Sequence, residues 1–142
     1  IITVSSCGNN DKKEVKSEVS KNEVSKKVES TDPMDDKGIG PITSITLGEI
    51  DETLAAKGKE VFKAKCTACH KINKRYIGPA LKGVTKKQSP EWIMNMILNP
   101  EVMIAKNATA KALLAEFSAP MANQHLTKDE ARAVLEYFRT KN

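Results

Sequence analysis

The sequence is poor in aromatic residues, histidines and long apolar runs. Only 4% of its 142 residues are Phe, Trp or Tyr, so a core built from protein side chains alone would be lean. We therefore expect a large apolar cofactor to fill part of the interior. Two histidines limit the metal chemistry that is possible, and three cysteines, an odd number, exclude a framework made only of disulfides. No run approaches the roughly 18 consecutive apolar residues of a membrane-spanning helix.

The length suits a single domain with an attached tail, and the composition divides the chain accordingly. Residues 8–31 are rich in Lys, Glu, Ser and Val, and they lack aromatic residues, Leu and Ile. Such a segment buries too little apolar area to offset the entropy of ordering, so we predict a disordered tether, with a short amphipathic helix as the alternative. Residues 32–50 hold two Pro and three Gly, and they predict an extended segment on the surface of a domain at 51–142.

The excess of positive charge belongs to the C-terminal part of the chain. Residues 1–50 carry 7 basic and 9 acidic side chains, whereas residues 51–142 carry 16 basic and 9 acidic ones. Between Glu60 and Glu91 there is no acidic residue, and this stretch contains Lys63, Lys65, Lys71, Lys74, Arg75, Lys82, Lys86 and Lys87. Such a charge run indicates either a solvated surface or steering towards an acidic partner protein.

The chemistry is carried by residues 66–70, which read Cys-Thr-Ala-Cys-His. C-x-x-C-H is the attachment signature of a c-type haem. Cys66 and Cys69 lie three residues apart, on one face of a helix, so both thiols can add to the two vinyl groups along one edge of a porphyrin. His70 follows directly and can bind the iron as the proximal ligand. A zinc site needs a fourth ligand and a thioredoxin-like site needs a βαβ context, and the sequence offers neither.

Helical patterns surround this motif, and no alternating stretch predicts a sheet. One helix leads into the motif from a cap at Asp51, and a second begins at Ser89–Pro90 and ends at Asn99. A third fits residues 108–117, and a capping box at 127–130 starts the last one. The sequence thus predicts an all-α domain of about four to five helices around one covalent haem c.

This order of parts resembles the class I cytochromes c over about residues 51–142. The resemblance implies that the first and last helices cross near the haem, with a glycine and an aromatic residue of the first helix packed against the last. Gly58 and Phe62, facing Leu135 and Phe138, fit this pattern.

The G-P-x-L loop of that family matches residues 78–81. The resemblance implies that the Pro79 carbonyl accepts a hydrogen bond from His70 and that Leu81 covers a haem face. Trp92 belongs to the same expected pocket, and two roles stay open for it. Its indole N–H reaches a haem propionate, or it anchors its helix in the core and donates to a nearby carbonyl.

We assign the sixth iron ligand to Met121. It lies in a stiffened loop at 118–124, where a side chain can reach across the porphyrin face, and the family resemblance implies an axial Met in such a loop. Met94 and Met96 are expected to pack within a helix, Met103 within a loop after Pro100, and Met34 outside the domain. His125 is the alternative ligand and is expected at the surface. A Met/His pair raises the potential of the iron and leaves no open coordination site.

Residues 1–7 resemble the end of a bacterial lipoprotein signal with its lipobox Cys7. This resemblance implies cleavage before Cys7 and lipid attachment to its thiol and amine, and the alternative is an ordinary thiol in a frayed terminus. Several acyl chains hold a protein firmly on a membrane. A coil from Cys7 to Thr53, of about 45 residues, would reach roughly 35–40 Å.

The sequence therefore predicts a periplasmic one-electron carrier rather than an enzyme, tethered to a bacterial membrane and monomeric. For a tethered carrier of this kind we expect a quinol-oxidising complex as donor and a terminal oxidase or a denitrification reductase as acceptor. Residues 32–50, joined to this domain, resemble the small cytochromes that accompany nitrous oxide reductases. The alternatives are a fixed haem subunit of a larger respiratory complex, and a haem peroxidase or gas sensor with an open sixth site. Nucleic acid is not an expected partner, because covalent haem requires an export compartment.

Overall fold

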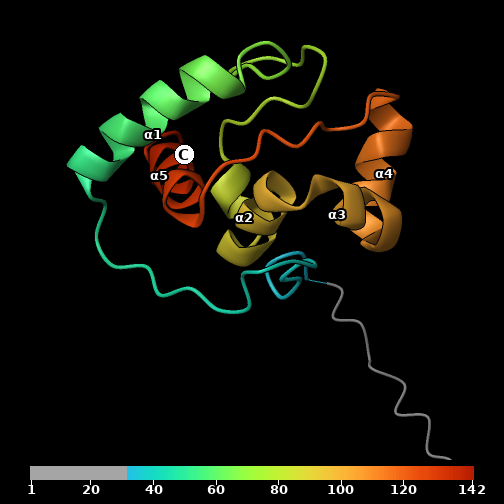
Figure 1. Cartoon of the computed structure of the whole chain (residues 1–142), viewed down its shortest axis with the longest axis horizontal. Helices are drawn as coiled ribbons and strands as arrows, with labels where there is room; N and C mark the ends of the chain where they lie inside the picture. The colour runs from blue at the N-terminus through green and yellow to red at the C-terminus, as the bar shows by residue number, and fades with distance from the viewer. Residues whose placement is uncertain (1–31) are drawn as a thin grey trace, which may run out of the picture.

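The computed structural model describes residues 32–142. Cys7 and the predicted tether at 8–31 lie outside the described residues. The described chain forms five α-helices and a short 3₁₀ helix: α1 (Glu52–Lys65), η1 (Val84–Lys86), α2 (Pro90–Leu98), α3 (Pro100–Lys106), α4 (Ala108–Phe117) and α5 (Lys128–Arg139) (Figure 1). Residues 32–142 contain no strand, so the predicted all-α fold is confirmed. None of these helices is both long and apolar enough to cross a membrane.

The helix starts follow from local hydrogen bonds that the sequence predicts. The side chain of Asp51 caps α1, and the Ser89 hydroxyl caps α2, whose first residue is Pro90. Thr127 and Glu130 form the capping box that begins α5. Each of these side chains satisfies backbone N–H groups that have no partner within the helix.

Helix α3 is absent from the sequence prediction, which expects a loop after Pro100. In the structure Pro100 is the first residue of α3, where its missing N–H costs nothing because that group has no helical acceptor. The proline that follows α2 therefore also begins the next helix. Met103 lies in α3 rather than in a loop, and its side chain is fully buried in the core, so the packing role expected for it is confirmed.

Helices α1 and α5 cross at close range (Figure 1). A Cβ atom at Gly58 would overlap the backbone carbonyl of Ala133, so only glycine lets the two backbones approach this closely. One turn further on, the Phe62 ring packs edge-on against Phe138 with 5.7 Å between ring centroids. The predicted crossing of the first and last helices is confirmed, and it fixes the end of α1 against the core.

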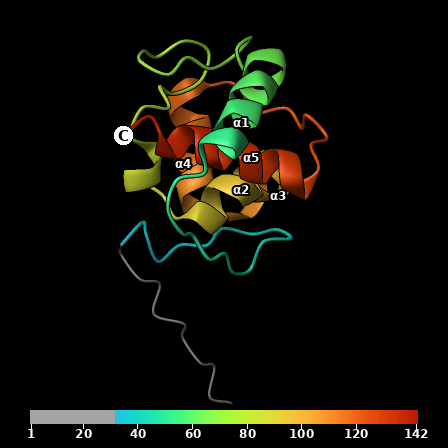
Figure 2. The ribbon, with the colours of Figure 1, turned by 90° about the vertical axis from the view of Figure 1, so that its left-hand side faces the viewer.

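Residues 32–50, which we call the N-terminal strap, run beneath α2 and then rise to the start of α1 (Figures 1 and 2). The buried side chain of Asn95 holds the strap to α2. Its amide donates to the carbonyls of Lys37 and Ile42, at 2.9 and 2.8 Å, and its oxygen accepts from the Ile42 N–H at 3.0 Å. The strap is therefore an ordered part of the structure.

Asp36 of the strap connects the starts of two helices. Its backbone carbonyl accepts a hydrogen bond from the Ser89 hydroxyl that caps α2, at 2.5 Å. Its carboxylate accepts from the side chain of Asn107 at 2.8 Å, and Asn107 in turn caps α4 by accepting from the Ala110 N–H. The strap thus helps to orient α2 and α4, which line the cavity described next.

Candidate haem-binding site

The C-x-x-C-H motif forms a tight turn at the end of α1. The N–H groups of Cys69 and His70 both donate to the carbonyl of Cys66, at 3.1 and 2.9 Å. Cys66 is half-buried and Cys69 is exposed, and both are free thiols. Burial, and to a lesser extent the neighbouring Cys69, raises the pKa of the Cys66 thiol to about 11. Cys66 is therefore a protonated thiol at neutral pH.

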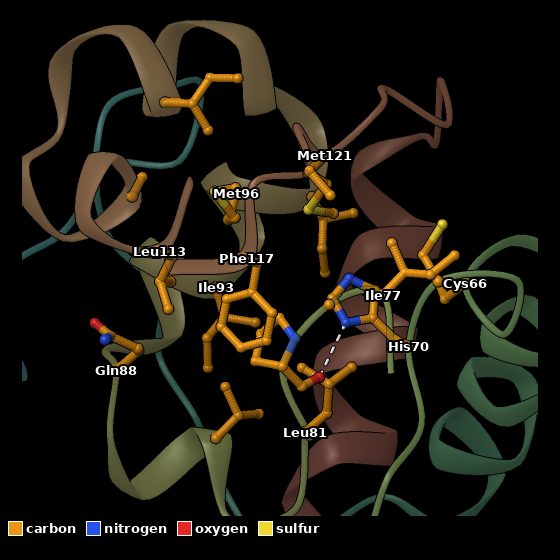
Figure 3. A pocket seen from close by; sticks show the side chains of 18 of the residues that line it. Cys66, His70, Ile77, Leu81, Gln88, Ile93, Met96, Leu113, Phe117 and Met121 are labelled. Atoms are coloured by element: carbon orange, nitrogen blue, oxygen red, sulfur yellow. Dashed lines mark hydrogen bonds between the residues drawn. The ribbon is translucent and has the colours of Figure 1, made fainter. Parts of the chain in front are cut away.

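The imidazole of His70 is held in one orientation. Its Nδ1 lies 3.2 Å from the carbonyl oxygen of Pro79 (Figure 3). Because a carbonyl can only accept, Nδ1 carries the hydrogen, and Nε2 keeps a free lone pair for a metal. Burial lowers the pKa of His70, while the hydrogen bond to Pro79 acts in the opposite direction. The ring is therefore neutral at pH 7, as a metal ligand must be.

A loop after the motif supplies this carbonyl. The N–H of Gly78 donates to the Cys69 carbonyl at 2.8 Å, and the Leu81 N–H donates to Lys71 at 3.1 Å. A Cβ atom at Gly78 would lie 2.5 Å from Cε1 of His70. The absence of a side chain at Gly78 lets the imidazole lie directly against the loop backbone.

Next to His70 the structure contains a cavity of about 380 Å³ with mainly apolar walls. This volume is typical of pockets that bury organic ligands. Cys66, Cys69 and His70 line one side, and α2, α4 and the loop before α5 supply most of the rest. Figure 3 shows the side chains of His70 and Met121 extending into the cavity, with Ile93, Leu113 and Phe117 among the apolar residues beside them.

These residues fit a haem. Two neighbouring thiols, an oriented imidazole and a thioether converge on one cavity whose walls suit a flat apolar ring. Gly78 provides the cradle for the imidazole. Residues 32–142 contain no group of three or more His, Cys, Asp or Glu side chains that could hold a metal ion by themselves. The donor set therefore suits an iron that a porphyrin already carries.

The structure brings together most of the residues singled out from the sequence. The hydrogen bond implied between His70 and Pro79 is present, and Pro79, Leu81 and Met121 all line the cavity. His125 is exposed, has a left-handed backbone with φ of 53° and is not among the lining residues. The expectation of a surface position for His125 is confirmed.

Trp92 lines the cavity, but its indole N–H is already engaged. Nε1 donates to the side-chain oxygen of Asn107 at 3.1 Å. This hydrogen bond favours the role of Trp92 as a core anchor over the role in which its indole N–H reaches a haem propionate. Only 4% of the Trp92 surface is exposed. The sequence could not identify the acceptor, because Asn107 comes near Trp92 only through α3.

Two features, one beside the cavity and one in its wall, carry no clear signal in the sequence. Arg75 joins the loop after the motif to α4: its guanidinium donates to the Glu116 carboxylate at 2.6 Å and lies over the Phe117 ring, 3.9 Å from its centroid. Glu116 is 41 residues away from Arg75 in sequence. The second feature is Gln88, a polar side chain in the cavity wall.

The model of the family described as Cytochrome c matches residues 55–141, which is more than half of the chain. The chain belongs to the cytochrome c family. Proteins of this family bind one covalent haem c, so the cofactor predicted from the C-x-x-C-H motif is confirmed.

Individual cytochromes c are similar to more than half of the chain. It is 30% identical to cytochrome c-551 of Ectopseudomonas mendocina over 86 residues, which are 60% of this chain and 98% of that protein. The structure of a cytochrome c from Rhodothermus marinus has 45% identity and a TM-score of 0.70, with 71% of this chain and 88% of that chain covered. An engineered form of the Rhodothermus marinus protein gives 44% identity and a TM-score of 0.69, with coverages of 71% and 89%.

Proposed function

We propose that the protein is a class I, monohaem electron carrier in which His70 and Met121 are the axial iron ligands and Cys66 and Cys69 hold the haem through thioethers. A bound haem c supplies the Fe(III)/Fe(II) couple. The observation that carries the proposal is the convergence of the oriented His70 imidazole and the Met121 thioether on one apolar cavity beside the motif. Membership of the cytochrome c family supports electron transfer as the general activity.

The protein side chains have three tasks in this function. Pro79 fixes the His70 ring, so that its free nitrogen keeps one direction in both oxidation states. The apolar walls exclude water, which limits reorganisation around the iron when an electron arrives or leaves. Met121 lies on the loop between α4 and α5 and lines the cavity; it would bind a haem iron as the sixth ligand and would leave no coordination site for a substrate. This arrangement disfavours the peroxidase and gas-sensor alternatives.

The function is tested on the matured holoprotein by a pyridine haemochrome assay and a redox titration. We expect a spectrum with two thioether bonds, one haem per chain and a reversible one-electron transition. Rapid binding of carbon monoxide to the reduced protein would contradict a closed sixth site and would favour gas sensing or peroxidase chemistry. Absence of covalent haem would contradict the proposal altogether.

We propose that the basic stretch around the motif is the docking face for a redox partner. Seven of its eight basic side chains are exposed, the exception being the half-buried Lys71. On the same loop Tyr76 and Ile77 are 53% and 47% exposed, and Ile77 also lines the cavity. Exposed apolar side chains, Tyr76 and Ile77, together with the exposed basic side chains of this stretch suit a partner protein whose docking site has acidic residues at its rim.

The proposed location is the periplasm, with a lipid on Cys7 as membrane anchor and the protein acting as a monomer. Because the N-terminal strap packs on the domain, residues 8–31 alone are left as the tether. A coil of this length reaches about 25–30 Å, less than the span expected when residues 32–50 are counted as part of the tail. Cys7→Ser is expected to release the protein from the membrane fraction and to remove the acyl mass from the mature chain.

The proposed donor is a quinol-oxidising complex, and the proposed acceptor is a terminal oxidase or a nitrous oxide reductase. The resemblance of the strap and haem domain to small cytochromes that accompany nitrous oxide reductases supports the second acceptor. Oxidation of the reduced protein by each purified acceptor, followed by stopped-flow absorption, would distinguish the two. Stable co-purification with a larger complex would favour the alternative of a fixed subunit.

A further inference from the structure

Gln88 has an atom without a partner in the wall of the cavity. Among the side-chain oxygens and nitrogens of residues 32–142, its Oε1 is the buried atom that makes no hydrogen bond. A buried polar group without a partner is unfavourable, and native proteins usually explain such a group by a ligand or an ordered water. Gln88 also lines the cavity, so a group bound there can become the partner of its amide once the amide turns towards the cavity.

Hydrogen bonds of the Gln88 backbone and of the next residue hold Gln88 in its place in the cavity wall. Its N–H donates to the Val84 carbonyl at 3.0 Å, immediately after η1. The next residue, Ser89, caps α2 and is itself bonded to the strap. Gln88 is therefore held between two elements of the cavity wall.

The position of Gln88 matches one edge of a haem. Figure 3 shows Gln88 on the opposite side of the pocket from Cys66, with His70 between them. On a porphyrin of the haem type the two propionates project from the edge opposite the two vinyl groups. Attachment at Cys66 and Cys69 therefore turns the carboxylate edge towards the side of the cavity that Gln88 lines.

Other polar side chains of the wall are less suited to this contact. The indole N–H of Trp92 is taken by Asn107, and the Gln124 amide donates to the Ala122 carbonyl at 3.3 Å. Lys65 directly precedes Cys66, at the attachment edge. Lys87, beside Gln88, is exposed and also lines the cavity, so it adds positive charge on the same side.

We infer that Gln88 binds a haem propionate, donating an amide N–H hydrogen bond to its carboxylate. A carboxylate only accepts, so the amide must present its Nε2–H groups, and not Oε1, to the cavity that Gln88 lines. The inference rests on the haem attachment in the proposed function. It identifies a cofactor-binding residue that neither the motif nor the G-P-x-L loop contains.

Resonance Raman spectra of the ferrous holoprotein test this contact through the propionate bending band, whose frequency rises with hydrogen bonding. We expect Gln88→Leu to shift the band to lower frequency. Gln124→Leu, which changes the other glutamine of the cavity wall, is the matched control and is expected to leave the band in place. An unchanged band in Gln88→Leu, with normal haem content, would overturn the inference.

A second measurement needs no variant and therefore does not depend on folding of the mutant. In the ferrous wild-type protein, nuclear Overhauser effects are expected between the Gln88 side-chain amide protons and the propionate methylene protons. Their absence in an assigned spectrum would overturn the inference even where Gln88→Leu fails to mature. Absence of covalent haem from the wild-type protein would instead overturn the proposed function, so the two failures are distinguishable.

Discussion

At the scale of single residues, the orientation of His70 depends on the absence of a side chain at Gly78. The imidazole lies so close to this backbone that a Cβ atom would be 2.5 Å from Cε1. Two carbon atoms that are not bonded to each other do not approach this closely, so the ring or the loop would have to move. The same ring is hydrogen-bonded to the Pro79 carbonyl. The close contact with Gly78 and this hydrogen bond together restrict the orientation of the His70 ring.

Gly78→Ala is therefore expected to displace the ring and weaken its hydrogen bond to Pro79. We expect a loss of about 1–3 kcal/mol in the free energy of unfolding, the range for an added methyl group in a packed site. Chemical denaturation of the holoprotein measures it. Gly48→Ala is the matched control, because a Cβ atom there meets no other atom within 4 Å. Equal stability of the two variants would contradict this account of Gly78.

At the scale of elements, α5 is tied to the start of α1 through a buried carboxylate. Glu136 has no exposed surface, and it accepts hydrogen bonds from the Asp51 N–H at 2.9 Å and from Arg139 at 2.7 Å. Arg132 donates to its other oxygen. Burial alone would raise the pKa of Glu136, but these three donors outweigh it and hold the pKa below the usual range. Arg139 also donates to the carbonyl of Gly48 in the strap.

The lowered pKa of Glu136 makes this contribution depend on pH. It is fully present above the pKa of glutamate in the unfolded chain, about 4.3, and it is lost as pH falls through the lower folded value. Glu136→Gln is expected to lower the free energy of unfolding by about 3 kcal/mol at pH 7, because it leaves two partly buried arginines, Arg132 and Arg139, without a charge partner. Urea denaturation should show this difference shrinking at strongly acidic pH. Glu60→Gln, at an exposed position of α1, serves as control, and a difference independent of pH would contradict the assignment.

Local signals made most elements predictable from the sequence. The caps at Asp51, Ser89 and Thr127 act within three residues, so the sequence contains all that determines them. Helix α3 was not predictable in this way, because a proline marks a helix start as well as a helix end. The motif at 66–70 identified the cofactor for the same local reason.

Contacts between distant residues account for what the sequence did not contain. Asn107 as the partner of Trp92, and Glu116 as the partner of Arg75, follow only from the packing of α2, α3 and α4. A role of Gln88 in cofactor binding could not be predicted from the sequence, because a single glutamine before a helix cap belongs to no motif and only the structure places it in the cavity wall. The role of Met121 was predicted from its loop and stays a prediction.

At the scale of the whole molecule, the charge distribution is expected to govern association with a partner. Lys74 is exposed on the loop after the motif, while Lys57 is exposed on α1, more than two turns before Cys66. Lys74→Glu should lower the second-order rate constant of electron transfer severalfold at low ionic strength, and added salt should reduce the difference. Stopped-flow kinetics measures this, and an equal effect of Lys57→Glu would indicate net charge rather than a docking face.

The central claim is that Met121 closes the iron site opposite His70, and the absorption spectrum of the oxidised holoprotein tests it most directly. The account predicts a weak far-red sulfur-to-iron band in the wild-type protein that is lost in Met121→Ala. The band should persist in Met96→Leu, which alters the other methionine lining the cavity, and in His125→Ala. A band that survives in Met121→Ala but disappears in Met96→Leu, or a wild-type spectrum without the band, would contradict the account.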